Sequence, residues 1–561
     1  MRQLTRNPLV WILMVAAGLR LAGLFWGLPA SDGWDDDGFA PRNFLTALAL
    51  TYKQGSYFTY PPLHAIFLAV LTLPGLALAL LHAPSLHQGD VIGEFIKPQY
   101  MTFFAVTARL VNLVLSLGII WCVGAMAELV AGRRAGLFAA GACALNFALT
   151  YYGQVSNLDV PYLFWALLAL LWVMRAVCEA QPQRFWLAAL FAAAAIAAKD
   201  QAYALFALSL PAFALLWFAS DPWPRAHVRR VVRTVLLAAL VALFLVLLVD
   251  GAITNPAGFV RRLAFLTGPA SADFAAYPKG WNGLHALLLD MAAWFGAGAA
   301  LPATLLAVMG VGLVVTRTKD RGAWTAGLLP ALAILSFTVC FNFTALRTDA
   351  RFLLPQAILG CVYIGIAAAW LTSLSQPGMR LAASAVIAVA ALVSLHVCIA
   401  VSAAMLQDPR YDAQSWMQTH VAPGETIETY GQNAYLPHFP AAATVMRVDA
   451  KPLSRRNPLP GVREVRSAFD APRASRFIVV NDWWMRHYTD PQSELGGHRS
   501  PSPAQAALFR DTAARRYFTD LRDGRLPYRL AHRASAVAGF WPQVHIHESL
   551  GEAILIYERV P

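Results

Sequence analysis

The stretch TARLVNLVLSLGIIWCVGAMAELV, residues 107–130, decides the fold class of this chain. It carries almost no charge, and as a helix rising about 1.5 Å per residue it is long enough to cross a hydrocarbon core of roughly 30 Å. Similar stretches recur as far as residue 402. The 561 residues are 58% hydrophobic and only 14% charged, which is too apolar for an ordinary soluble protein. We therefore predict a polytopic α-helical membrane protein.

Eleven segments have the length and composition of a full span. They are residues 9–28, 107–130, 135–152, 160–177, 185–200, 202–219, 234–251, 285–315, 323–343, 353–372 and 381–402. A further apolar stretch, 61–82, begins beside Pro61 and Pro62, which block helical hydrogen bonds and stiffen the chain. We predict that it is a membrane-surface or re-entrant element. The segment 285–315 is long enough to contain a break.

Positive charge sets the predicted orientation, because cytoplasmic loops carry an excess of Lys and Arg. When eleven spans alternate, the basic run 225–233 lies inside together with most basic residues of the short loops. Counting 61–82 as a further span would move that run outside. We therefore expect the long loops 29–106 and 252–284 to lie on the outer side.

The character of the sequence changes near residue 403. The remainder mixes Pro, Arg, Asp and His and has no apolar run of spanning length. We predict a transmembrane domain at 1–402 and an outer, soluble α/β domain at 403–561, close to the usual size of a single domain. The patterns predict a helix at 411–420 and strands at 475–480 and 553–557.

Composition also limits the partners. All six cysteines fall in hydrophobic segments, which excludes a disulfide framework in the soluble domain. The net charge of +12 fits positive loops and phospholipid contact better than nucleic acid, so we expect no nucleic-acid partner.

Trp483 and Trp484 follow the strand 475–480 and are predicted in a strand-end loop, where stacking on a sugar and facing the membrane are both open.

An acidic run directly after the first predicted span forms the first candidate site. It reads SDGWDDDG, residues 31–38. Carboxylates next to a region of low dielectric cost free energy unless they are paired or used. One such use is as a general base, in which a carboxylate accepts a proton from a hydroxyl. A solvated turn is the alternative, because Asp and Gly favour turns.

Asp159 and Lys199 lie at the outer ends of predicted spans. Asp159 stands at the start of a helix with Pro161 in its first turn, so an N-cap role and a site role are both open. Lys199, with Asp200 and Gln201, separates two apolar segments. These three residues form either a tight turn or a place where the Lys charge meets a lipid-linked phosphate.

Three arginines extend this set of charges. Arg351 and Arg109 stand near outer span ends, and Arg261 lies in the loop 252–284. Interfacial snorkelling and anion binding are both open for them. The sequence has no GxGxxG, Walker loop or zinc-type Cys/His spacing, so nothing in it supports a nucleotide-sugar or ATP site.

These motifs, taken together and in this order, resemble the GT-C superfamily of integral membrane glycosyltransferases. The resemblance is nearest to the bacterial branch similar to protein O-mannosyltransferases and aminoarabinose transferases, glycosyltransferase families 39 and 83. It is carried by the acidic run and by YPPL at 60–63, NLDVP at 157–161, Lys199, RFLLP at 351–355 and DPRYDAQSWM at 408–417.

The resemblance implies the fold, the reaction and its place. The fold is a GT-C membrane domain, and the reaction is an inverting transfer of a sugar from a polyprenyl-phosphate-linked donor to an acceptor hydroxyl. The acceptor is a protein, a lipid or a glycan, and the bilayer is the other partner. The implied location is the bacterial cytoplasmic membrane, with the C-terminal domain outside the cytoplasm.

The resemblance also implies roles for residues. It places the catalytic base on Asp36, with Asp37 in a position where the family has Glu. Because this chain has three consecutive aspartates, Asp35 and Asp37 stay open as the base. Asp159 matches the second acidic position. No cofactor is certain, and a divalent metal ion bridging Asp36 and Asp159 stays open.

Basic residues complete the implied site. Lys199 and Arg351 match positions that contact the donor phosphate, and Arg109 and Arg261 add positive charge. Phe352 stands where the family usually has Tyr.

Two functions of other classes compete with this prediction. A transporter or flippase of lipid-linked saccharides would place ionisable residues near the bilayer midplane and often shows internal repeats. Here the charges lie at span ends, and the two halves show no repeat. A non-catalytic assembly or sensor protein is the other rival, and sugar transfer or donor hydrolysis by the purified protein would exclude both.

Overall fold

The structure is a computed structural model that describes residues 7–35, 41–220, 224–297, 300–449, 459–467, 469, 474–490, 497–501, 503, 506, 510–536, 546 and 550–561. The chain forms two compact units. The first contains Met1–Leu21, Asn43–Leu71 and Ala108–Ile399, and the second contains Ala22–Arg42, Thr72–Thr107 and Ala400–Pro561.

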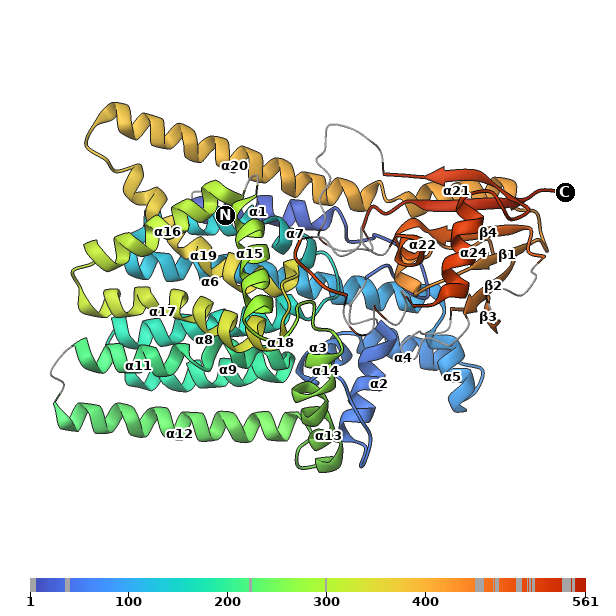
Figure 1. Ribbon diagram of the computed structural model, residues 1–561. Coiled ribbons are helices and arrows are strands. Elements are labelled where there is room, and N and C mark those ends of the chain that lie inside the picture. The colour runs from blue at the N-terminus through green and yellow to red at the C-terminus, as the bar shows by residue number, and fades with distance from the viewer. Residues whose placement is uncertain are drawn as a thin grey trace. The chain divides into compact units, whose positions relative to one another are not determined.

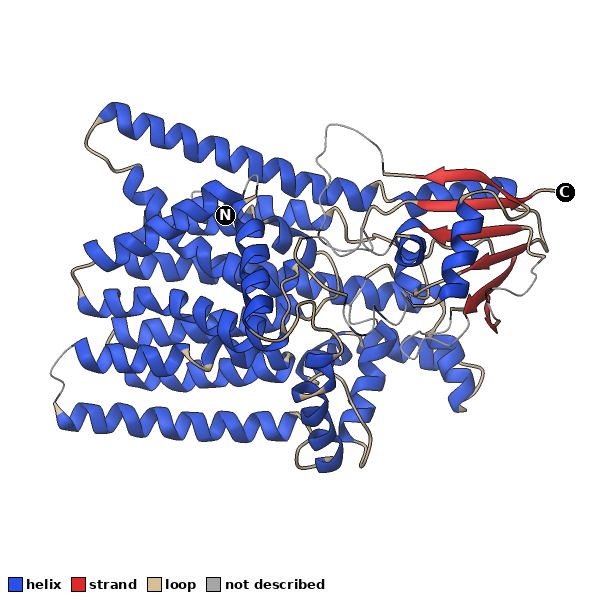
Figure 2. Cartoon of the chain, in the orientation of Figure 1, coloured by secondary structure: helices blue, strands red, loops and turns tan. Residues whose placement is uncertain are grey.

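The first unit is built from helices (Figures 1 and 2). They are α1 (Pro8–Leu21), α2 (Pro41–Tyr52), α3 (Leu63–Leu71), most of α6 (Pro98–Ala144), α7 (Phe147–Tyr152), α8 (Asp159–Cys178), α9 (Phe185–Ala198), α10 (Tyr203–Phe206), α11 (Ser209–Ser220), α12 (Arg225–Val249), α13 (Pro256–Thr267), α14 (Pro269–Ala272), α15 (Trp281–Gly296), α16 (Ala300–Arg317), α17 (Arg321–Phe337), α18 (Phe343–Ala345), α19 (Ala350–Leu371) and α20 (Pro377–Leu406). Two 3₁₀ turns, η2 (Pro182–Arg184) and η3 (Asp200–Ala202), and a π-helical turn, η4 (Thr338–Asn342), join some of them.

The chain is a multi-pass membrane protein. Among the described residues, eight helices are long and apolar enough to cross a membrane, or nine if α3 and α4 (Leu73–His82) form one broken span. The other predicted spans are helical as well but do not meet that length test alone. The chain leaves the helical path after Leu21 in α1 and at Lys199 after α9, so both helices are short. The predicted span 135–152 is divided between α6 and α7.

Two of the predicted apolar segments are interrupted. The stretch 61–82 is divided at Thr72 into α3 and α4, and neither has the length of a span. The segment 285–315 is divided between α15, which ends at Gly296, and α16, which begins at Ala300.

Helix α6 is a helical hairpin rather than one straight rod. The backbone is non-helical at Ala131 and Gly132, and Gly132 has a φ of 81° that glycine adopts without strain. A Cβ atom added to Gly136 would lie 2.8 Å from the carbonyl oxygen of Gly124. Twelve residues apart on one straight helix, these two would be separated by roughly 18 Å. The two halves therefore fold back on each other, as two separate spans were predicted to do.

The centre of the first unit is packed through small residues. Helices α8 and α19 are buried over most of their length, whereas α12 and α20 are largely exposed. At Gly310 and Gly365, an added Cβ would overlap backbone atoms of Tyr363 and Ala135. Such close contacts are typical of membrane helices, where packing rather than the hydrophobic effect holds the helices together.

The second unit contains a six-stranded sheet with the order β3-β2-β1-β4-β6-β5. The strands are β1 (Thr426–Thr429), β2 (Thr444–Asp449), β3 (Val462–Arg466), β4 (Phe477–Asn481), β5 (Tyr528–Ala534) and β6 (Ile554–Arg559). Strands β3, β2, β1 and β4 are parallel, and β6 and β5 are antiparallel to their neighbours. The helical elements are α4, α5 (Gln88–Phe95), α21 (Pro409–His420), α22 (Asp482–Thr489), α24 (Thr512–Arg522), the 3₁₀ turn η5 (Asn433–Tyr435) and the first part of α6.

Helices cover both faces of this sheet. Side chains alternate along a strand, so Phe477 and Val479 of β4 pack in the core beneath α21, and Ile478 and Val480 pack in the core beneath α22 and α24. A central strand that is apolar on both faces is expected from this arrangement. The predicted helix 411–420 and strands 475–480 and 553–557 correspond to α21, β4 and β6.

The prediction of a strand-end loop at Trp483 and Trp484 is wrong. Asn481 accepts a hydrogen bond from the Trp484 amide (3.2 Å) and thereby caps α22 directly after β4. Trp484 is buried in the core beneath that helix and is not available for stacking on a sugar.

The boundary at residues 402 and 403 stays a prediction about the chain. In space, residues from Ala400 onward form a unit with Ala22–Arg42 and Thr72–Thr107. Composition does not show that these two earlier segments belong to the same compact unit as the C-terminal sheet.

Candidate functional site

A buried carboxylate at the start of α8 is the centre of the site in the first unit. Asp159 is 0% exposed. Its Oδ1 accepts hydrogen bonds from Lys199 Nζ (2.6 Å) and Gln201 Nε2 (3.0 Å). Its Oδ2 has no hydrogen-bond partner among the described residues. The carboxylate is therefore held from one side and offers an acceptor on the other.

The predicted N-cap role of Asp159 is not what the structure shows. The helix begins at Asp159 itself, and Leu158 occupies the cap position without a side-chain hydrogen bond. The carboxylate therefore receives Lys199 and Gln201 instead of helix amides. Its negative charge still lies at the positive end of the helix dipole.

The loop before α8 is fixed by two asparagines. Asn112 Nδ2 on α6 donates to the carbonyl oxygens of Val155 and Asn157, both at 2.7 Å. The Asn157 side chain accepts a hydrogen bond from the amide of Asp159 (2.6 Å). Because Asn112 and Asn157 are buried, water does not compete for these bonds. They set the position of the Asp159 backbone.

Lys199 is both a turn residue and an ion-pair partner. Its backbone is extended (φ −158°, ψ 128°) and ends α9 before η3 begins. Its side chain, 14% exposed, pairs with Asp159 and lies with Nζ 5.7 Å from the centre of the Tyr162 ring. The predicted tight turn is present, and contact of Lys199 with a lipid-linked phosphate stays a prediction.

The next residue of the same turn belongs to a second charge cluster. Asp200 accepts a hydrogen bond from Arg262 Nη2 on α13, and Asp250 Oδ2 lies 3.5 Å from the same nitrogen. Arg262 is 1% exposed, and its guanidinium lies 5.0 Å from the centre of the Phe58 ring. Burial, with a smaller contribution from Asp200, raises the pKa of Asp250 to about 7, although Arg262 opposes the shift. Asp250 is the residue directly after α12.

Helix α13 is also bonded to the loop before α3. Asn255 is fully buried and caps α13 by accepting a hydrogen bond from Gly258 N (3.0 Å). It accepts another from Gly55 N (2.9 Å) and donates to Ser56 O (2.9 Å). Arg261, predicted to bind phosphate, donates to Gly55 O. Within the first unit, α13 therefore contacts both the 199–201 turn and the loop at 55–58.

Arg351 lies in the first turn of α19. It is half-buried, with its guanidinium 4.6 Å from the centre of the Phe352 ring. Tyr152, fully buried at the end of α7, lies within electrostatic range of Arg351, Asp159 and Asp349. The start of α19 and the start of α8 therefore lie near the same tyrosine.

The remaining predicted residues are distributed over both units. Arg109 is fully buried on α6, three residues before Asn112. Asp35 belongs to the second unit and is half-buried. Asp36 and Asp37 lie outside the described residues. Within the described part of the chain, no group of three or more His, Cys, Asp or Glu side chains has the arrangement of a metal site, so the metal bridge stays a prediction.

The second unit has a cavity of about 250 Å³ on its sheet. It is lined by Thr426, Glu428, Met446, Val448, Val465, Ser467, Ala474 and Ser475. The Glu428 carboxylate is fully buried there and accepts hydrogen bonds from the hydroxyls of Tyr430 and Ser475. A buried carboxylate thus lines a cavity together with apolar side chains, a composition common in small-molecule sites.

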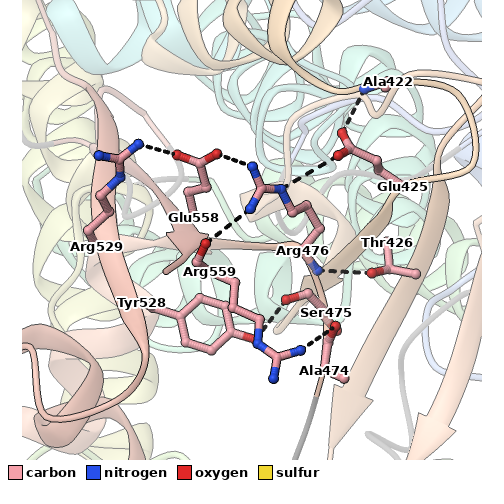
Figure 3. Close-up of polar contacts among 10 residues, drawn as sticks. All are labelled: Ala422, Glu425, Thr426, Ala474, Ser475, Arg476, Tyr528, Arg529, Glu558 and Arg559. Atoms are coloured by element: carbon pink, nitrogen blue, oxygen red, sulfur yellow. Dashed lines mark hydrogen bonds and ion pairs between the residues drawn. The ribbon is translucent and has the colours of Figure 1, made fainter. Parts of the chain in front are cut away.

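Arginine contacts beside this cavity join the strands (Figure 3). The amide of Arg476 donates to Thr426 of β1 (2.9 Å), and its guanidinium pairs with Glu558 of β6 (2.5 Å). Arg529 of β5 donates to the same Glu558 carboxylate at 2.9 Å. Two arginines and one glutamate therefore connect strands β1, β5 and β6.

Sequence reasoning grouped Asp159 with Lys199 but missed Gln201, Asp250 and Arg262 as members of the buried clusters. Asp250 offered a signal, since it is a lone acid at the end of the predicted span 234–251. Arg262 offered none that separates it from Arg261, because which of two neighbouring arginines faces inward depends on how α13 packs.

No protein-family model and no curated protein matches the chain. Among solved structures, it is similar to ArnT from Cupriavidus metallidurans bound to undecaprenyl phosphate, with 12% identity over 98% of this chain and 97% of that chain and a TM-score of 0.45. It is similar to the Archaeoglobus fulgidus oligosaccharyltransferase in the apo form, with 13% identity over 76% of this chain and 62% of that chain and a TM-score of 0.42.

It is also similar to the arabinofuranosyltransferase AftD from Mycobacteria, with 18% identity over 98% of this chain and 41% of that chain and a TM-score of 0.41. The chain thus spans less than two thirds of the oligosaccharyltransferase and of AftD. All three are GT-C glycosyltransferases, the superfamily that the sequence motifs resemble. None of these matches reaches a TM-score of 0.5, so the case for a function rests on the chain's own residues.

Proposed function

We propose that this protein is an inverting glycosyltransferase that moves a sugar from a polyprenyl-phosphate-linked donor to an acceptor hydroxyl at the outer face of a bacterial cytoplasmic membrane. The observation that carries the proposal is the buried Asp159, held by Lys199 and Gln201 and open at Oδ2 among the described residues. A carboxylate is kept buried and charged at a helix start only when it is paired or used. Here it is paired on one oxygen.

The reaction needs a base and a way to stabilise a leaving phosphate. Asp36 accepts the proton of the acceptor hydroxyl, and the hydroxyl oxygen forms a bond to the anomeric carbon of the sugar. The bond between that carbon and the phosphate oxygen breaks on the opposite face, and polyprenyl phosphate leaves with the electron pair. A base that is positioned in this way contributes roughly 10²–10⁴-fold to the rate.

Positive charge must meet the phosphate, since negative charge develops there. We assign this role first to Arg351, because it stands at the start of α19 within the same electrostatic environment as Asp159. Lys199 acts on Asp159 and on the phosphate, while Arg109 and Arg261 add to the positive field. Asp159 orients the acceptor or the donor through its second oxygen.

The test is transfer from a panel of polyprenyl-phosphate sugars by the purified full-length protein in lipid nanodiscs. We expect Asp36→Asn to lower kcat by about 10²–10⁴-fold. Asp90→Asn serves as the matched control, because Asp90 is an exposed acid on α5, and it should keep the wild-type rate.

The same assay includes Asp35→Asn and Asp37→Asn, which decide between the three neighbouring acids. If all three variants transfer the sugar as fast as the wild-type protein, the acidic run is not the base and the proposed mechanism is wrong.

A further inference from the structure

The acidic run contains a buried tryptophan, Trp34, which directly precedes Asp35 and belongs to the second unit. Trp34 is 1% exposed. Its ring stacks on His438 with centroids 5.1 Å apart and meets the edge of Tyr411 at 4.8 Å. The guanidinium of Arg410 lies 4.2 Å from its centre, and Trp26 packs against it at 6.0 Å. We call Trp26, Arg410, Tyr411 and His438 the Trp34 cage.

Polar contacts hold the cage itself in place. Asp408 binds the Arg410 guanidinium through two bonds of 2.8 and 2.7 Å and accepts a hydrogen bond from Trp26 Nε1 (3.1 Å). The Tyr411 hydroxyl accepts a hydrogen bond from the amide of Gly27 (2.8 Å). A Cβ atom at Gly27 would lie 2.6 Å from the Trp34 ring, so glycine is required there for the close approach.

The imidazole of the cage stacks as a neutral ring. Burial, followed by the positive charge of Arg410, lowers the pKa of His438 to about 4. Among the residues of the Trp34 cage, the cation is then Arg410, whose guanidinium contacts the Trp34 ring in the geometry of a cation–π pair. Tyr411 and Arg410 stand at the start of α21, the first helix of the C-terminal region.

A second contact of the acidic run is made by Asp32. Asp32 Oδ2 accepts a hydrogen bond from Asn433 Nδ2 (2.6 Å), and Asn433 in turn accepts one from Arg447. Arg447 is fully buried on β2 and is paired with Glu464 of β3. Asp32 is therefore connected to the strands of the sheet and is used structurally.

We propose that the C-terminal region positions residues 32–35 of the acidic run through Trp34 and Asp32, and that Trp34, Arg410 and Asn433 are positioning residues for Asp35, which directly follows Trp34. This inference rests on the proposed function, because it assigns the acids a catalytic task. It gives the motif at 408–411 a physical role: the motif forms one wall of the cage, and no substrate contact is needed to explain it.

The experiment combines kinetics with hydrogen exchange on the full-length protein in nanodiscs. Trp34→Ala should lower kcat by about 10²-fold with little change in the donor KM, because a displacement of about 1 Å at a reacting group has that effect. The amides of residues 31–35 should exchange at least about tenfold faster, the consequence of losing roughly 1.4 kcal/mol of local stability. Trp34→Phe should recover part of the kcat and part of the protection of these amides.

Two further variants keep the test decisive. Arg410→Lys preserves the charge but not the planar contact, and we expect it to act like a milder Trp34→Ala. Trp416→Ala is the matched control, because Trp416 lies on the same helix α21 but stacks on His420 and His532, away from the cage. It should leave kcat and the exchange of residues 31–35 unchanged. If Trp34→Ala does not fold, Trp34→Phe and Arg410→Lys decide.

The two proposals fail in different ways. If Asp36→Asn, Asp35→Asn and Asp37→Asn are all fully active, the proposed function fails, and the exchange data alone decide whether the cage holds the run. If one of those variants is inactive while Trp34→Ala and Arg410→Lys keep the wild-type kcat and exchange, the positioning role is wrong.

Discussion

At the scale of single residues, the first unit is organised by charges that are buried in pairs. Asp159 is paired with Lys199, and Arg262 is paired with Asp200 and Asp250. Since Lys199, Asp200 and Gln201 follow each other in one turn, that turn contacts both clusters. These three consecutive polar residues therefore contribute to both clusters of buried charges.

Removing one partner of the first pair should be costly. Lys199→Met leaves the Asp159 carboxylate buried without its cation, and we expect a loss of about 3 kcal/mol in stability together with a loss of transfer activity. Lys199→Arg should keep most of the stability.

A double variant separates structure from chemistry here. Lys199→Met with Asp159→Asn removes both charges, so thermal stability should return close to that of the wild-type protein while activity stays low. Thermal unfolding and transfer rates in the same nanodiscs measure both. Full activity of Lys199→Met would contradict a role for the pair in the reaction.

At the scale of elements, the α6 hairpin shows how glycine permits a membrane fold. The turn at Gly132 reverses the chain, and Gly124 and Gly136 then allow the two halves to touch through their backbones. Any larger side chain at this contact must push the halves apart, because the neighbouring atom is a backbone carbonyl oxygen rather than a flexible side chain.

Gly136 and Gly141, both in the second half of the α6 hairpin, provide a matched comparison. Gly136→Leu should destabilise the protein by about 1–3 kcal/mol through overpacking. Gly141→Leu, at a position with no atom within 4 Å of the added Cβ, should be nearly neutral. Thermal unfolding in nanodiscs compares the two. Equal unfolding temperatures for both variants would show that the hairpin contact is not tight.

At the scale of the whole molecule, the two units should respond to pH in opposite directions. The Asp250 pKa of about 7 is raised from the ordinary value near 3.8. Between about pH 4 and 7, the folded state therefore holds a proton that the unfolded state has released, and this contribution to stability falls as pH rises. Arg262 of α13, Asp200 of η3 and Tyr52 of α2 face this group.

The contribution of Glu558, in the second unit, to stability depends on pH in the opposite direction. Its pKa is lowered, chiefly by the hydrogen bond from Arg529 and also by Arg476. Its contribution to stability is therefore present above about pH 4.5 and is lost as pH falls through the lowered value.

Hydrogen exchange at several pH values measures both effects in one sample. After correction for the intrinsic rate, protection of residues 250–262 should decrease from about pH 4 to 7, and protection of residues 554–559 should decrease below about pH 4.5. Asp250→Asn and Glu558→Gln should each remove the dependence of their own segment alone. Parallel changes in both segments would contradict this assignment.

The sequence by itself determined the membrane class, the helical segments and the α/β character of the C-terminal region. These properties follow from local composition: an apolar run of spanning length must become a helix, because its backbone has no other partners in lipid. The break in 285–315 and the reversal after residue 130 were visible for the same reason. Asp159 and Lys199 could be named because a charge beside an apolar segment stands out.

Tertiary structure alone decided which charges meet and which segments pack together. That Arg262 rather than Arg261 is buried between two carboxylates depends on the face that α13 presents. That Trp34 lies against Arg410 and His438, hundreds of residues later in the chain, depends on packing of the second unit. Contacts between distant parts of a chain leave no local pattern in sequence, because the energy that selects them arises only when the surfaces are buried together.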